Sequence, residues 1–264
     1  MARILPIVIM VMVSMLFVLA APAHGAIHTE NVAYVAGGVT LMGFLACDDS
    51  LPGLRPGVLV APEWWGLNDY AKMRAKKLAE LGYVALAIDM YGDGKTASDA
   101  DEAGKLSRAL RAQPAVLRNR ANAGLKALTS NPRVDPSRVA AVGYCFGGTV
   151  ILELVYSGAP LAGAVTFHAG LTTPEADDLP NVRTRLLICH GADDTFETPE
   201  QITAFQDAMR RGGFDWQMIY FGGAVHSFTN PDSNRYVMQG VGYNANADRR
   251  SWEYMKLFFA EVFG

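Results

Sequence analysis

The sequence is poor in cysteine and histidine and has no marked excess of charge of either sign. Three cysteines and five histidines occur in 264 residues, and the formal net charge at pH 7 is -3. No run of basic residues points to nucleic acid as a partner. Neither an H-E-x-x-H pattern nor closely paired cysteines occur, so we expect no metal or cofactor. The chain also has no internal repeat and no low-complexity linker.

A single long apolar run occurs, and it opens the chain. Arg3 precedes the almost wholly apolar stretch from Ile4 to Ala20, and Ala21-Pro22-Ala23 follows it. This pattern predicts a signal peptide over residues 1–25, cleaved near Ala23 to Gly25. The alternative is an uncleaved membrane anchor, although the run is short for a span of about 20 residues. We expect a periplasmic or secreted protein with no stable membrane span after cleavage.

The remaining residues, 26–264, have the length and apolar content of one globular domain. Short apolar segments alternate with helical patterns after an opening hairpin turned at Gly37-Gly38. This alternation predicts an α/β fold with a mostly parallel sheet covered by helices on both faces. Strands are expected at 30–34, 39–46, 57–61, 83–88, 137–142, 162–167, 185–189 and 216–221, and helices at 69–81, 98–112, 114–129, 149–155, 199–211 and 247–262.

One cysteine lies in a motif typical of nucleophiles. Cys145 stands between Gly143 and Gly147, after a predicted strand and before a predicted helix. This is the G-x-[SC]-x-G elbow, with cysteine at the serine position. The helix start favours a thiolate at Cys145, and the Phe146 N–H is a natural oxyanion donor. The alternative interpretation of Cys145 is a small buried core residue.

A base and an orienting acid are expected after the nucleophile in the chain. His226 follows the last predicted strand, and the loop after the preceding strand carries Asp193 and Asp194. The pattern H-G-x-x-D selects Asp194 as the acid over Asp193. His168 ends a strand and is a pocket candidate, although a structural histidine is the simpler interpretation. His190 is interpreted as a turn residue.

With these residues in place, the chain resembles the dienelactone hydrolase (carboxymethylenebutenolidase) family of α/β-hydrolases. The resemblance extends over nearly everything after the predicted signal peptide. It rests on five motifs, Pro62-Glu63-Trp64-Trp65-Gly66, Asp89-Met90-Tyr91-Gly92, Gly143-Tyr144-Cys145-Phe146-Gly147-Gly148, His190-Gly191-Ala192-Asp193-Asp194 and His226-Ser227-Phe228.

The resemblance implies a Cys145–Asp194–His226 triad and a role for Glu63. In the family this glutamate contacts the resting thiol and assists its activation; a carboxylate there can accept the thiol proton and disfavours a permanent thiolate. The alternative for Glu63 is a solvated loop acid. The resemblance also implies that the Trp64 N–H is the second oxyanion donor. Trp64 and Trp65 are expected either to wall the pocket or simply to pack.

Two positions depart from the family pattern. Dienelactone hydrolases of aromatic degradation hold the substrate carboxylate with arginines at places occupied here by Asp93 and Asn230. A carboxylate-bearing lactone is therefore not the expected substrate. Ser227 and Tyr91 remain candidates for the pocket lining.

We therefore expect a hydrolase acting on a small ester or lactone, as a monomer or small homo-oligomer. The alternatives are a thiol-dependent peptidase or thioesterase, a hydrolase-fold binding protein with an inactive site, and a redox sensor that uses Cys145. Because the cysteine count is odd, not all thiols can pair. A Cys47–Cys189 disulfide is conceivable, and two buried thiols are the simpler interpretation.

Overall fold

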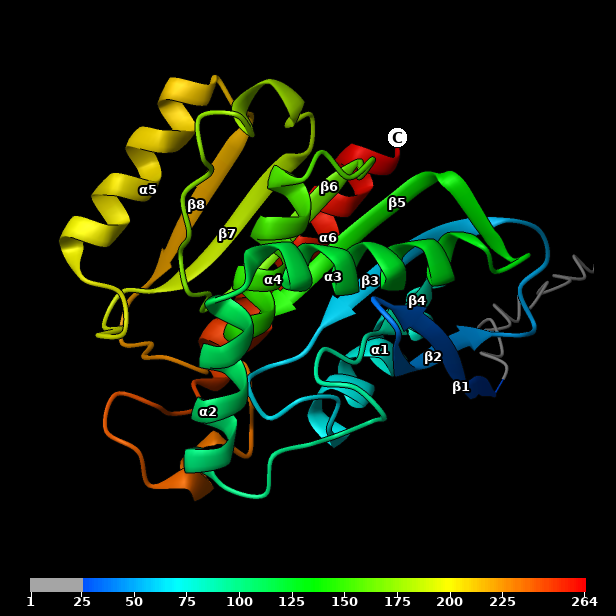
Figure 1. Cartoon of the computed structure of the whole chain (residues 1–264), viewed down its shortest axis with the longest axis horizontal. Coiled ribbons are helices and arrows are strands. Elements are labelled where there is room, and N and C mark those ends of the chain that lie inside the picture. Colours follow the sequence, from blue (N-terminus) through cyan, green and yellow to red (C-terminus); the bar gives the residue numbers. More distant parts are fainter. Residues whose placement is uncertain (1–25) are drawn as a thin grey trace, which may run out of the picture.

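The computed structural model describes residues 26–264, and the predicted signal peptide lies outside this range. The described residues form one sheet of eight strands in the order β1-β2-β4-β3-β5-β6-β7-β8 (Figure 1). β1 and β2 pair antiparallel, as do β2 and β4, and every other neighbouring pair is parallel. The strands are β1 (Ile27–Ala36), β2 (Val39–Asp48), β3 (Arg55–Ala61), β4 (Val84–Ala87), β5 (Val134–Tyr144), β6 (Gly163–Phe167), β7 (Arg185–Gly191) and β8 (Trp216–Phe221).

Helices cover the two faces of this sheet. α1 and α6 pack on one face, and α3, α4 and α5 pack on the other, where they form the second half of the core. The helices are α1 (Asp69–Glu80), α2 (Ala100–Arg111), α3 (Pro114–Thr129), α4 (Phe146–Tyr156), α5 (Pro199–Gly212) and α6 (Ala245–Phe263), with short 3-10 turns at Leu179–Asn181 and Ser233–Tyr236. The predicted fold class, an α/β-hydrolase fold, is confirmed.

Local signals in the sequence account for several element ends. Asn68 caps α1 by accepting a hydrogen bond from the Ala71 N–H at 3.2 Å. A capping box between Thr198 and Gln201 starts α5, and Gly213 ends that helix in the left-handed region, with φ 64°. The buried stretches of the central strands differ from the helices because they are apolar on both faces. Residues 58–61 of β3 have no exposed surface, as expected for a parallel strand covered on both faces.

The strand order determines where a ligand site can form. From β3 the chain passes through α1 to β4 on one side, then returns across β3 to β5 and continues to β8. The reversal lies between β3 and β5, and crevices at such points, at the carboxyl ends of the strands, bind ligands in open α/β sheets. The loop after β3 carries Glu63, and Cys145 follows β5 directly. Glu63 and Cys145, two of the predicted site residues, therefore lie at this reversal of the strand order.

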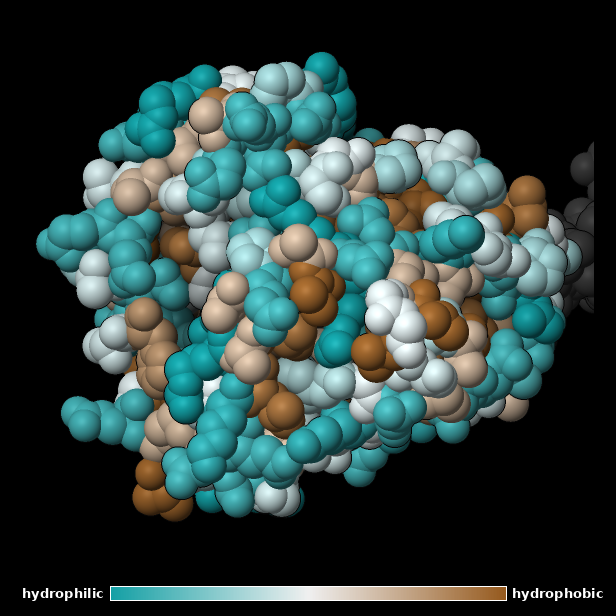
Figure 2. Space-filling model, in the orientation of Figure 1, coloured by the Kyte–Doolittle hydropathy of each residue, from teal (hydrophilic) through white to brown (hydrophobic). Residues whose placement is uncertain are grey.

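Figure 2 shows one face of the molecule coloured by hydropathy. Hydrophilic side chains dominate that face, and apolar residues are scattered in small groups. Scattered apolar residues are normal on a protein surface. No helix within residues 26–264 has the length and apolarity needed to cross a membrane.

All three cysteines are buried and free. Cys189 has no exposed surface in β7, and burial raises its pKa. Cys47, in β2, lies 3.4 Å from the Asp49 carboxylate, and burial raises its pKa as well. The two are core thiols in this structure, so the interpretation without a disulfide is the one observed.

Candidate active site

The elbow around Cys145 forces β3, β5 and α4 into close contact. A Cβ built on Gly147 would lie 2.1 Å from the Ala61 carbonyl oxygen, and one on Gly143 would lie 2.2 Å from the Gly147 carbonyl oxygen. Contacts this short are not possible, so both positions require glycine. Cys145 itself is the cap residue of α4 and has φ 53° and ψ -117°. This geometry is the strand–turn–helix arrangement expected for the elbow.

Strained backbone is concentrated at the site. Cys145, His168 and Ser227 are non-glycine residues with positive φ, at 53°, 40° and 57°. Such conformations cost about 1–3 kcal/mol each and persist only where surrounding contacts impose them. Here the Cys145 N–H donates to the Phe167 carbonyl at 3.0 Å, and the His168 N–H donates to the Cys189 carbonyl at 2.9 Å.

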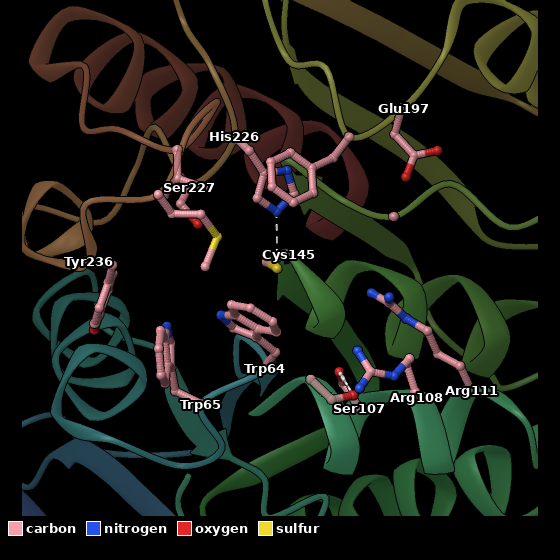
Figure 3. Close-up of a pocket in the computed structure, with 15 residues that line it drawn as sticks. Trp64, Trp65, Ser107, Arg108, Arg111, Cys145, Glu197, His226, Ser227 and Tyr236 are labelled. Carbon is pink, nitrogen blue, oxygen red and sulfur yellow. Dashed lines mark hydrogen bonds between the residues drawn. The ribbon is translucent and has the colours of Figure 1, made fainter. Parts of the chain in front are cut away.

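A chain of contacts joins the three residues of the predicted triad. His226 Nε2 lies 3.1 Å from Cys145 Sγ (Figure 3), and His226 Nδ1 lies 2.8 Å from Asp194 Oδ2. All three side chains are more than nine-tenths buried. Asp194 also accepts from the Phe196 N–H at 2.9 Å, whereas Asp193 is exposed. The geometry thus places the carboxylate at 194, and not the one at 193, against the imidazole.

The electrostatics of His226 follow from its two neighbours. Burial alone lowers the pKa of an imidazole, but the adjacent Cys145 and Asp194 outweigh it and raise the pKa of His226 to about 10. A protonated imidazole between a thiolate and a carboxylate is the arrangement that activates a cysteine nucleophile.

Glu63 is buried and contacts the loop that carries His226. Its carboxylate accepts from Ser227 Oγ at 2.8 Å and from Asn230 Nδ2 at 2.7 Å. Burial raises the pKa of Glu63, and these two hydrogen bonds partly offset that rise. Glu63 is therefore no solvated loop acid. The Cys145 thiol is hydrogen-bonded to His226 in this structure, while the Glu63 carboxylate holds the loop that carries His226.

The two residues expected to supply oxyanion donors lie close to Cys145: Phe146 follows it directly in the chain, and Trp64 lines the same cavity. Phe146 is the first residue of α4, where backbone N–H groups have no partner within the helix. Trp64 lies in the loop after β3, and the Tyr91 hydroxyl donates to its carbonyl at 2.7 Å. The Tyr91 ring also stacks on Phe146, with centroids 6.2 Å apart. Tyr91 therefore contacts both of these residues.

A cavity of about 260 Å³ opens in front of the thiol and is lined by Trp64, Trp65, Cys145, His226 and Ser227 among others. Trp65 stacks on Tyr236, with centroids 4.3 Å apart.

Of the four residues predicted for the pocket, Trp65 and Ser227 line this cavity. Tyr91 supports the wall, and His168 has no exposed surface and packs behind His226, with ring centroids 5.4 Å apart. His190 is the buried penultimate residue of β7, so its interpretation as a turn residue is wrong.

Three charged residues of the cavity were not predicted. Arg108 and Arg111 extend from α2 toward the side of the cavity that holds Cys145, and Glu197 faces them from the loop before α5 (Figure 3). Neither guanidinium has an ion-pair partner within residues 26–264. Arg111 lies over the Phe146 ring at 5.3 Å. Glu197 is 9% exposed, and burial raises its pKa to about 7.

Fold and site together define an α/β-hydrolase with cysteine at the nucleophile position. No group of three or more metal-ligating side chains within the described residues is placed to hold an ion. The model of the dienelactone hydrolase family matches residues 41–263, and the chain belongs to that family.

Individual relatives agree with this assignment. The chain is 45% identical to a dienelactone hydrolase-like promiscuous phosphotriesterase from metagenomic libraries. The two structures align over 91% of this chain and 100% of the other chain, with a TM-score of 0.88. A candidate carboxymethylenebutenolidase of Yersinia pestis is 26% identical over 90% of each chain. An uncharacterised Caenorhabditis elegans protein is 36% identical over 149 residues, which are 56% of this chain and 94% of that protein.

The elbow contact leads to a stability prediction. We expect Gly147→Ala to destabilise the fold by more than about 3 kcal/mol, because the added Cβ collides with backbone atoms that cannot turn aside. Gly222→Ala is the matched control, since a Cβ there meets no atom within 4 Å, and it should change stability by less than about 0.5 kcal/mol. Chemical denaturation of both variants measures the difference, and equal stabilities would contradict the steric argument.

Proposed function

We propose that this protein hydrolyses a small carboxylic ester or lactone through a thioester acyl-enzyme. The observation that carries the proposal is the position of His226, with one ring nitrogen 3.1 Å from the Cys145 sulfur and the other 2.8 Å from the Asp194 carboxylate. Nucleophile, base and orienting acid are in mutual contact at the end of one cavity, which is the arrangement that acyl transfer requires.

The first half of the reaction forms the thioester. The Cys145 sulfur attacks the carbonyl carbon, and the N–H groups of Phe146 and Trp64 stabilise the negative charge that develops on the carbonyl oxygen. His226 then gives its proton to the leaving oxygen as the carbon–oxygen bond breaks. Asp194 holds His226 in the tautomer and orientation that this transfer needs.

The second half regenerates the thiolate. His226, now neutral, accepts a proton from water, and the resulting hydroxide attacks the thioester carbon. The carbon–sulfur bond breaks, the acid leaves, and Cys145 and His226 return to the ion pair. Glu63 supports both steps from a distance, because its hydrogen bonds to Ser227 and Asn230 keep the His226 loop against the thiol.

The cavity charge favours substrates that carry an anionic group. Asn230 does not face the substrate as an anion ligand, since it donates to Glu63. Arg108 and Arg111 line the same cavity from α2 instead, and two cations without an ion-pair partner attract an anion. Glu197, with its pKa raised to about 7, tunes this attraction, because its ionisation at higher pH offsets part of the arginine charge.

Alternative activities differ in what they predict for Cys145. A binding protein with an inactive site predicts a thiol that iodoacetamide does not label, whereas the His226 contact predicts a reactive one. A peptidase or thioesterase would use the same triad, so only a substrate panel separates these activities from an esterase.

Phosphotriester cleavage is a second candidate activity, favoured by the 45% identity to the promiscuous phosphotriesterase, and hydrolysis of paraoxon tests it.

We also propose that the chain is exported and that residues 1–25 are removed. The support is the sequence pattern of Arg3, the apolar run and the small residues at 21–23. Mass spectrometry of protein isolated from an exporting host tests this, since retention of the first 25 residues in the exported fraction would contradict it.

The triad gives a prediction for p-nitrophenyl acetate hydrolysis. Cys145→Ala should abolish turnover, and Asp194→Asn should lower kcat by about 10⁴-fold with the fold intact, because the imidazole loses its correct tautomer. Asp193→Asn is the matched control and should keep wild-type rates, since residue 193 is exposed. Steady-state kinetics and circular dichroism check all three, and the reverse result for the two aspartates would exchange their roles.

The α2 arginines give a prediction for charged substrates. Arg111→Gln and Arg108→Gln should raise KM for mono-p-nitrophenyl succinate while leaving KM for p-nitrophenyl acetate unchanged. A carboxylate that loses a charge-assisted hydrogen bond loses about 1.5–3 kcal/mol, which is roughly 10- to 100-fold. Equal effects on the two esters would show that the arginines do not bind the substrate anion.

The same subsite should respond to pH. In the wild type, KM for the succinate ester should rise between pH 6 and 8 as Glu197 ionises, because the pKa of Glu197 is about 7 and the new negative charge weakens anion binding. Glu197→Gln should remove this dependence and keep the low KM at both pH values. A dependence that persists in Glu197→Gln would assign the titration to another group.

A further inference from the structure

The loop from His226 to Asn230 is held by two sets of contacts. Ser227 and Asn230 donate to Glu63. Thr229, which has no exposed surface, faces α1. The loop needs such contacts because Ser227 adopts φ 57° directly after the histidine, a conformation that relaxes unless its surroundings impose it.

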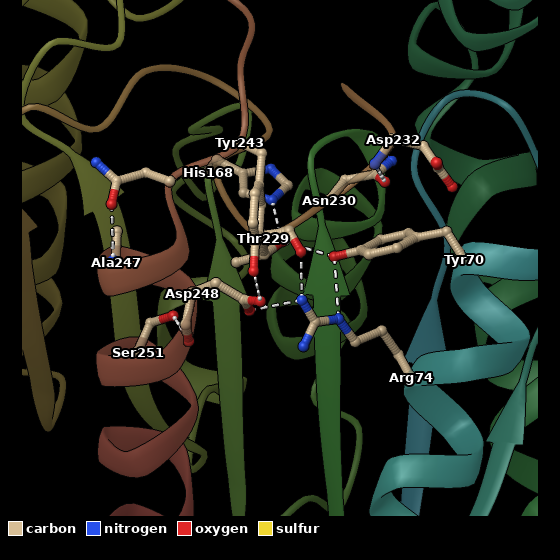
Figure 4. A network of polar contacts seen from close by, with 11 residues as sticks. Tyr70, Arg74, His168, Thr229, Asn230, Asp232, Tyr243, Ala247, Asp248 and Ser251 are labelled. Atoms are coloured by element: carbon tan, nitrogen blue, oxygen red, sulfur yellow. Dashed lines mark hydrogen bonds and ion pairs between the residues drawn. The ribbon is translucent and has the colours of Figure 1, made fainter. Parts of the chain in front are cut away.

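The contact between this loop and α1 is anchored by a buried arginine. Arg74 of α1 is 1% exposed, pairs with Asp248 of α6 at 2.6 Å and donates to the Thr229 carbonyl (Figure 4). Its guanidinium also lies over the rings of Tyr144 and Trp252, at 5.4 and 5.5 Å. An arginine enclosed in this way has a single available position, so it is a rigid point of attachment for the loop.

A second connection runs through hydroxyl groups. Arg74 Nε donates to the Tyr70 hydroxyl at 3.2 Å, the Tyr70 hydroxyl lies 2.6 Å from Thr229 Oγ1, and Thr229 Oγ1 lies 2.6 Å from His168 Nε2. Because a guanidinium can only donate, the Tyr70 hydroxyl accepts from Arg74, and Thr229 Oγ1 lies within hydrogen-bond distance of both the Tyr70 hydroxyl and His168 Nε2. The Thr229 hydroxyl thus joins Tyr70 to His168.

His168 transmits this arrangement to the site. Its ring packs against the His226 ring with centroids 5.4 Å apart and an interplanar angle of 64°. Burial, together with the nearby charge of His226, holds the pKa of His168 well below its usual range. A neutral neighbour is required here, because a second cation would oppose the positive charge that His226 carries beside the thiolate.

We propose that Thr229 is a positioning residue, whose hydroxyl and carbonyl connect the Arg74 anchor to His168 and keep the His226 imidazole in contact with Cys145. The inference rests on the proposed function, in which that contact activates the thiol. Valine has nearly the shape of threonine without the hydroxyl, whereas serine keeps the hydroxyl. The two substitutions therefore separate hydrogen bonding from packing at this position.

The experiment compares Thr229→Val with Thr229→Ser in the full chain. Iodoacetamide labelling of Cys145 is followed from pH 5 to 9, and kcat/KM is measured with p-nitrophenyl acetate. In Thr229→Val the midpoint of labelling should move to higher pH, because a displaced imidazolium no longer favours the thiolate. Its kcat/KM should fall by about 10²-fold, as expected for a small displacement of a reacting group. Thr229→Ser should keep the wild-type profile and rate.

The labelling profile distinguishes positioning from stability alone. A residue that only stabilises the fold changes the melting temperature and leaves the labelling midpoint in place, so a folded Thr229→Val with the wild-type profile overturns the inference. Should Thr229→Val not fold, Tyr70→Phe replaces it, because it removes the hydroxyl that contacts Thr229 and keeps the ring. The midpoint of Cys145 labelling should again move to higher pH. A wild-type labelling profile in Tyr70→Phe overturns the inference.

Failure of the proposed function has a different signature. Wild-type protein that labels at Cys145 but hydrolyses no ester contradicts the proposed reaction, and the labelling profiles still decide the role of Thr229. Wild-type protein that hydrolyses the ester, with Thr229→Val equal to it in both measurements, contradicts the positioning role alone.

Discussion

The close approach of α4 to β3 is the constraint on which the site depends. With no side chain at Gly147, the helix start comes within van der Waals distance of the Ala61 backbone, and the loop after β3 is then adjacent to Cys145. Glu63 and Trp64 belong to that loop. The same contact therefore creates the turn, places the thiol at its crest, and brings Trp64 to the cavity that Cys145 lines.

Buried charged groups contact the loop that carries His226. Ser227 and Asn230 of this loop donate to Glu63, and its Thr229 carbonyl accepts from Arg74, which pairs with Asp248. Buried ion pairs gain little net stability, because desolvation offsets their attraction. Their value here is geometric: each charged group is enclosed on several sides, so it can hold a strained loop in one conformation.

The parts of the site that are local in sequence were predictable, and the parts that depend on packing were not. Glycines around Cys145 and the order of Cys145, Asp194 and His226 can be found by inspection, because each motif directly follows a strand. Arg108 and Arg111 lie three residues apart on an amphipathic helix, where a solvated face is the usual interpretation. Thr229 lies 159 residues from Tyr70, and no spacing rule connects positions so distant.

Part of the support for the His226 loop and its Arg74 anchor comes from α6. Asp248 and Asn244 belong to the start of α6, and the Asn244 N–H donates to the Phe228 carbonyl at 3.0 Å. α6 is synthesised about 100 residues later than Cys145. The segment that carries Cys145 therefore leaves the ribosome before Asp248 and Asn244 exist, and the His226 loop gains these contacts only once α6 has packed against the sheet.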